Sequence, residues 1–211
     1  MISGPDQDAT APGSWGAGLQ PPPPEALEPF PEYPFHQRCE RSVPLSLADA
    51  AGIALDFTHQ CMTCRYKVGS VVGQEVFERE QSPYRFIVWQ DVSKQILPHI
   101  HVKSSSFAEV RLFGSLTGER FLIDTKSLDK EHARQKSARY QRRSAPAFSV
   151  LHSRWTLQRQ PAGAGRSASV HITLEAGGRT AGIAKLVPKA ILRHELRHVI
   201  LESLEFYDVP G

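Results

Sequence analysis

Hydrophobic and polar positions alternate along much of the chain after residue 66, and this pattern predicts β-strands. Between residues 170 and 175 the order V-H-I-T-L-E places apolar side chains on one face and polar side chains on the other. Runs rich in Val, Ile and aromatic residues predict strands within residues 66–77, 84–92, 108–126, 148–158 and 167–175. The connections are too short for crossover helices, which predicts an antiparallel sheet of about six strands.

Two segments show helical spacing instead. Apolar residues within 45–55 recur at intervals compatible with a short helix. Residues 188–207 contain no glycine and no proline after the first position, and Leu192, Val199 and Ile200 fall on one side of a helical wheel. The chain therefore predicts an α+β fold, with a mostly antiparallel β-sheet covered by a C-terminal amphipathic helix.

The first 37 residues differ in composition from the rest. They hold nine of the 16 prolines and neither Lys nor Arg, which is typical of segments that cannot bury a core. We expect a disordered, acidic, proline-rich arm at 1–37 and a single α+β domain at 38–211. The stretch 21–35 could form polyproline II and present Phe30 and Tyr33 to a polyproline-recognising partner.

Charge is distributed unevenly. Residues 38–211 hold all 25 basic side chains but only 17 of the 22 acidic ones, so their net charge is +8 against +3 for the whole chain. Such a surface suits nucleic acid or an acidic protein surface. No apolar run approaches the roughly 20 residues that span a bilayer, and the N-terminus lacks the features of a secretory signal. We expect a cytoplasmic or nuclear protein without a membrane partner.

The most basic stretch is 126–143, with seven basic residues against two acidic ones. Clustered cations neutralise phosphates, and an aromatic ring among them can stack on a base. An exposed polar loop or short helix is the alternative interpretation. The residues expected to make nucleic-acid contacts are Arg134, Lys136, Arg139, Tyr140, Arg142 and Arg143.

A group of cysteines and histidines predicts a small metal site. Cys61 and Cys64 have the spacing that lets two thiolates bind one tetrahedral ion. Cys39 and His59, or His36 in place of that histidine, could complete four ligands. A structural zinc ion is one interpretation of this pattern, and three free thiols are the other.

A second metal pattern lies in the C-terminal segment, where residues 194–198 read HELRH. His194 and His198 share one helical face, Glu202 one turn later could be a third ligand, and Glu195 could act as general base. In these five residues the chain resembles the zincin metallopeptidases, which implies a catalytic zinc. The wheel places both histidines on the polar face among arginines, which favours a solvated helix surface instead.

These patterns lead to one functional hypothesis and two alternatives. The chain lacks the glycine-rich phosphate loops and the nucleophile elbow of serine hydrolases. We interpret it as a non-enzymatic binding protein that uses its basic segment, with a structural zinc as an optional element. A small zinc metallopeptidase is the first alternative, and an assembly or scaffold subunit is the second.

Overall fold

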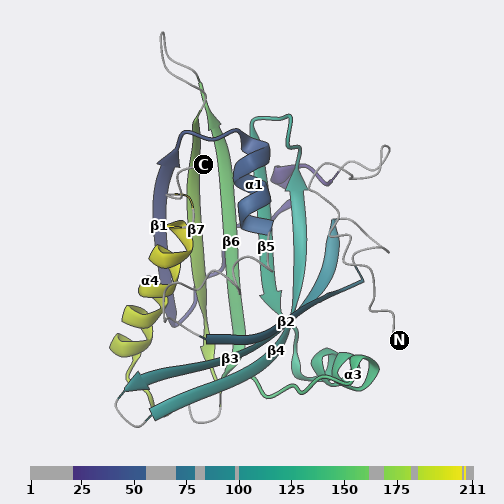
Figure 1. Cartoon of the computed structure of the whole chain (residues 1–211), viewed down its shortest axis with the longest axis vertical. Coiled ribbons are helices and arrows are strands. Elements are labelled where there is room, and N and C mark those ends of the chain that lie inside the picture. Colours follow the sequence, from purple (N-terminus) through teal and green to yellow (C-terminus); the bar gives the residue numbers. More distant parts are fainter. Residues whose placement is uncertain are drawn as a thin grey trace, which may run out of the picture.

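A computed structural model of the chain contains one antiparallel sheet of seven strands (Figure 1). It describes residues 21–55, 70–78, 84–97, 100–161, 169–181, 185–205 and 207. The strands are β1 (Phe35–Val43), β2 (Ser70–Phe77), β3 (Arg85–Leu97), β4 (Ile100–Gly114), β5 (Arg120–Ser127), β6 (Phe148–Gln160) and β7 (Ser169–Thr180). The helices are η1 (Pro24–Ala26), α1 (Leu47–Leu55), α3 (Lys130–Tyr140) and α4 (Lys189–Glu205).

The strand order is β1-β7-β6-β5-β4-β3-β2. Strands β2 to β7 are therefore neighbours in sequence order, and β1 pairs with β7 at the far edge. The predicted α+β class, antiparallel pairing and C-terminal helix are confirmed. A turn between β4 and β5 divides the strand run predicted at 108–126, and in it Gly118 donates its N–H to the carbonyl of Ser115 at 3.0 Å. Gly114 begins this turn with a φ of 83°, and a Cβ there would lie 2.2 Å from the carbonyl oxygen of Arg120.

The hydrophobic core lies between the sheet and the helices α1 and α4, both on one face of the sheet, which we call the inner face (Figure 1). Alternate residues of β3 to β7 fill this core. Ser46 starts α1 by accepting a hydrogen bond from the Asp49 N–H, and α1 buries three alanines against the strands. The phenol of Tyr207 donates to the carbonyl of Ala50 at 3.0 Å and so joins the C-terminal segment to α1.

The helix α4 is amphipathic, as predicted. Leu192 and Ile200 are buried, whereas His194 and His198 are exposed to solvent. The assignment of Val199 to the apolar side was wrong, since 39% of its surface is exposed. No helix in the described parts of the chain is long and apolar enough to cross a membrane.

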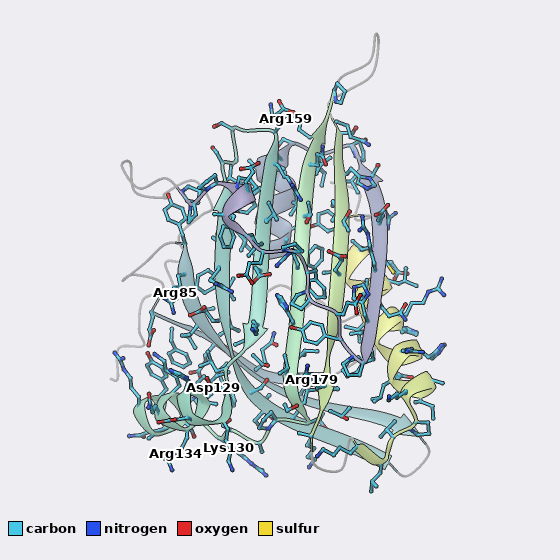
Figure 2. All side chains as sticks on the ribbon, turned by 180° about the vertical axis from the view of Figure 1, so that it is seen from behind. Arg85, Asp129, Lys130, Arg134, Arg159 and Arg179 are labelled. Carbon is cyan, nitrogen blue, oxygen red and sulfur yellow. The ribbon has the colours of Figure 1, made fainter. Side chains whose placement is uncertain are left out.

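The structure differs from the sequence prediction for residues 21–37, which we expected to be a disordered arm. β1 starts at Phe35 and pairs with β7 over nine residues. Residues 21–34, called the outer strap here, lie on the face opposite α1 and α4, the outer face (Figure 2). The prediction failed because composition alone does not reveal that aromatic residues in the segment have binding partners on the sheet. Residues 1–20 lie outside the described part.

Candidate functional site

The outer face of the sheet carries a row of charged residues in direct cross-strand register. The row alternates in sign over most of its length, and ion pairs within it join Arg38 to Glu175 and join both Arg154 and Arg111 to Asp124. From β1 to β3 it consists of Arg38, Glu175, Arg154, Asp124, Arg111 and Arg85.

At its centre lies a buried cluster around Asp124, which is 1% exposed. Its Oδ1 accepts hydrogen bonds from Nε2 of His152 at 2.8 Å and from Nε of Arg154 at 2.9 Å, and Oδ2 lies 3.4 Å from Nη2 of Arg111. Burial acts to raise the pKa of Asp124, but the hydrogen bonds and charges of His152 and Arg154 outweigh it and hold this pKa below its ordinary value. The carboxylate is therefore ionised and fully partnered.

Tyr33 extends the cluster from the outer strap. Because a carboxylate can only accept, Nε2 of His152 carries the proton toward Asp124, and in the neutral ring Nδ1 accepts from the Tyr33 hydroxyl at 3.0 Å. Burial, followed by the charge of Asp124, raises the pKa of Tyr33, so the phenol stays protonated. A tyrosine, a histidine and an aspartate thus form a chain of hydrogen bonds. With His152 buried and both ring nitrogens occupied, this arrangement holds the strap in place and offers no free base.

Phe30 covers the same cluster. Its ring stacks on the imidazole of His152 with centroids 4.5 Å apart, and the guanidinium carbon of Arg154 lies 5.4 Å from the ring centroid. Arg154 also donates from Nη1 to the carbonyl of Glu28 at 2.8 Å. Gly177 leaves room for the Tyr33 ring, since a Cβ there would lie 2.8 Å from Cδ2 of the tyrosine. The sequence pattern predicted Phe30 and Tyr33 only as ligands of a separate partner, and it did not reveal His152, Arg154 or Gly177, because no local motif connects them to the strap.

The predicted basic segment forms α3, the helical alternative of the sequence analysis. Asp129 caps its N-terminus by accepting from the N–H groups of Glu131 and His132, both at 3.0 Å. Gln141 ends it in the left-handed region, with a φ of 53°. The helix lies beside β2, β3 and β4, where the ring of Tyr140 stacks on Phe77 with centroids 4.1 Å apart.

Most of the residues predicted to contact nucleic acid have partners within the chain. Lys136, Arg139 and Tyr140 all reach the carboxylate of Glu78, and Arg142 donates from Nε to Glu75 at 2.9 Å. Burial and the Glu78 carboxylate raise the pKa of Tyr140 to about 12. The ring of Tyr140 is packed against Phe77 and Phe107, and its stacking on a base stays a prediction that this packing does not favour.

Two of the predicted residues, Arg134 and Arg143, have exposed side chains, and so does Lys130 one turn before Arg134. Within the described residues no acidic side chain forms an ion pair with any of these three cations. Lys130 and Arg134 share one helical face, and Figure 2 shows both on the side of α3 that points away from the sheet. These three cations, called the basic patch below, are available to a partner.

The cysteine site is only partly within the described structure. Cys39 lies on β1 as a half-buried free thiol packed against the core. Burial raises its pKa, and the charge of Arg197 acts in the opposite direction. His59, Cys61 and Cys64 lie outside the described residues, so the zinc site of Cys39, His59, Cys61 and Cys64 stays a prediction.

The HELRH pattern lies on α4, where His194 and His198 are exposed and Glu195 is half-buried. The side chain of Glu202 lies outside the described part. Among described residues no group of three or more His, Cys, Asp or Glu is placed to hold a metal ion. A catalytic zinc at this position stays a prediction that the described geometry does not support.

Comparison with known proteins gives a distant structural likeness only. No family model and no curated protein matches the sequence. A conserved protein from Geobacillus kaustophilus matches with a TM-score of 0.49 and 8% identity, covering 82% of this chain and 92% of its own. A START superfamily protein from Mycobacterium smegmatis gives 0.47 and 13%, over 82% and 92%. The Zhui aromatase/cyclase from Streptomyces sp. R1128 gives 0.46 and 12%, over 81% and 87%.

Proposed function

We propose that this chain is a non-enzymatic binding protein that engages an acidic protein segment through the basic patch of Lys130, Arg134 and Arg143. The observation that supports this most is that one short basic stretch contains two groups of side chains, one bound to acidic residues of the chain and the other exposed to solvent. Four of its polar side chains bind Glu75 and Glu78 and fix α3 to the sheet. Lys130 and Arg134 are then presented to solvent on a helix that is held in place, and Arg143 follows three residues after its end.

An acidic protein segment fits this surface better than nucleic acid. The patch has three cations, with exposed Asp129 and Glu131 next to Lys130. A polynucleotide presents a regular row of phosphates and would be repelled by these carboxylates, whereas a protein partner can alternate its charges to match. The ring of Tyr140 is also occupied by Phe77, which removes the stacking platform that single-stranded nucleic acid commonly uses.

A charge-matched pair of double variants tests the proposal. Lys130→Ala with Arg134→Ala removes two cations from the patch. Arg120→Ala with Arg159→Ala removes two exposed cations from the other end of the sheet, where Figure 2 labels Arg159 and where Arg120 pairs with Gln158. The probes are a poly-glutamate peptide and a single-stranded oligonucleotide, each titrated at several salt concentrations. All four substitutions change exposed side chains, so the fold should be retained.

The proposal predicts that the patch variant binds the peptide at least fivefold more weakly at low salt, with a less steep salt dependence, because fewer ion pairs form. The control variant should bind like the unchanged chain. Equal loss in both variants would show that only net charge matters and would contradict the proposal. Preferential, patch-dependent binding of the oligonucleotide would favour nucleic acid instead.

A further inference from the structure

The outer strap contacts the sheet without becoming a strand of it. Among the described residues, the only backbone-to-backbone hydrogen bond between the strap and the sheet runs from Gly114 N–H to the carbonyl of Pro22, at 2.8 Å. The part of the strap from residue 28 to residue 33 has no regular secondary structure. Its attachment therefore depends on side chains and on single carbonyl groups, as in the recognition of a peptide by a folded domain.

Three residues of the sheet, His152, Arg154 and Gly177, contact the strap. His152 and Arg154 form a platform for the ring of Phe30, and Arg154 also donates to the Glu28 carbonyl. Nδ1 of His152 accepts from the phenol of Tyr33. Gly177 lies under the Tyr33 ring, where any larger residue would collide with it. These features come from β6 and β7, far from the strap in sequence.

The strap has the composition of a peptide ligand. Prolines at positions 29, 31 and 34 alternate with the aromatic residues Phe30 and Tyr33, which keeps the backbone extended and lowers the entropy lost on binding. His152 and Arg154 both donate hydrogen bonds to Asp124, so their side chains are held in position independently of the strap. A preorganised surface and a stiff ligand are the conditions under which a short segment binds specifically.

We propose that the outer face around His152, Arg154 and Gly177 is a recognition site for residues 28–33, which fill it within the same chain and can be exchanged with those of a second copy. The strap ends at Pro34, directly before β1, so a rotation there would release it as a unit. Phe30 lies four residues before Pro34, which is at most about 13 Å of extended chain, so exchange requires the site of the second copy to lie directly beside the start of β1.

Within one chain the strap has a large advantage over any competitor. A tethered segment is present at an effective concentration of about millimolar, so an added peptide competes poorly with an intact strap. Weakening the strap without changing the sheet should therefore uncover the site. Phe30→Ala with Tyr33→Ala does this, because both residues belong to the strap alone.

The first experiment measures binding of a fluorescent peptide with the sequence of residues 21–35 to the full chain. The strap variant Phe30→Ala/Tyr33→Ala should bind it at least tenfold more tightly than the unchanged chain does. A peptide with alanine at both aromatic positions serves as the control and should not bind. Equally weak binding of the intact peptide to both chains would overturn the proposal.

The second experiment tests the site on the sheet. Adding Gly177→Ala to the strap variant places a methyl group where the tyrosine ring would lie, and should abolish peptide binding. Because that change also crowds the backbone of Phe35, Arg154→Lys is a second variant that keeps a positive charge beside Asp124 but loses the platform. Circular dichroism checks that both remain folded. Retained tight binding in either folded variant would contradict the assigned site.

The third experiment tests exchange between copies. The strap variant offers an empty site, and Gly177→Ala alone offers an intact strap without its site. Each should be monomeric by sedimentation, whereas an equimolar mixture should form a dimer in which the strap of one copy occupies the sheet of the other. A mixture that stays monomeric at concentrations well above the dissociation constant of the peptide would overturn the exchange between copies.

Discussion

The two charged clusters of this protein use the same chemical groups in very different surroundings. Asp124 is 1% exposed and holds His152 and Arg154 beneath the outer strap. Glu75 and Glu78 bind basic side chains on and directly after α3, and 36% and 19% of their side chains remain exposed. Water screens the second cluster but not the first, so removing one partner should have much larger consequences in the first.

The largest expected effect follows from Asp124→Asn. The substitution keeps the shape of the side chain but leaves the buried guanidinium of Arg154 beside a neutral amide. We expect the free energy of unfolding to fall by about 3–5 kcal/mol, the usual cost of an uncompensated buried charge. Urea unfolding at neutral pH measures this change. A loss below about 1 kcal/mol would mean that the buried cluster is no more important than a surface pair.

A smaller effect is expected from Tyr140→Phe, which removes the hydrogen bond from the phenol to Glu78 but keeps the stacking on Phe77. The loss should be about 1 kcal/mol at neutral pH. The pKa of Tyr140 is raised from 10.0 to about 12 in the folded chain, so its contribution to stability is complete below pH 10.0 and decreases as pH rises through about 12.

The free energies of unfolding of Tyr140→Phe and of the unchanged chain should therefore converge at alkaline pH. Urea unfolding of both chains at a series of pH values between about 8 and 11.5 measures the difference directly. Tyr33 and Tyr207 titrate in both proteins, so their contributions cancel. A difference that stays constant up to pH 11.5 would contradict the role assigned to the Tyr140–Glu78 hydrogen bond.

The smallest effect is expected from Glu75→Gln, which breaks the half-exposed ion pair with Arg142. Its cost should not exceed about 0.5 kcal/mol and should shrink further at high salt, because solvent and ions already screen the pair. Denaturant unfolding at low and high salt is sufficient to measure it. A cost similar to that of Asp124→Asn would remove the contrast between the two clusters.

The sequence was informative where the signal is local. Alternation predicted the strand around residues 170–175, and helical spacing predicted α4 with its exposed histidines. Both patterns follow from burial of one face, which a single stretch of sequence records. Gln141 and Gly114, which end α3 and β4 in left-handed backbone conformations, also lie at boundaries that short-range chemistry favours.

The sequence was uninformative where partners are distant. The hydroxyl of Tyr33 meets His152 from 119 residues away, and Tyr140 meets Glu78 from 62 residues away. The composition was taken over residues 1–37 together, and this average over the outer strap and the residues before it predicted disorder. Counting charges in the basic stretch likewise overestimated the number available to a partner, because acidic residues on and beside β2 bind four of its side chains.

The most direct test of this account asks whether the outer strap lies on the sheet in solution. Nuclear Overhauser contacts between the ring protons of Phe30 and those of His152 report on rings whose centroids are 4.5 Å apart. The account predicts strong contacts in the unchanged chain and their loss in Tyr33→Ala. Absence of these contacts in the unchanged chain, with random-coil shifts for residues 28–33, would contradict it.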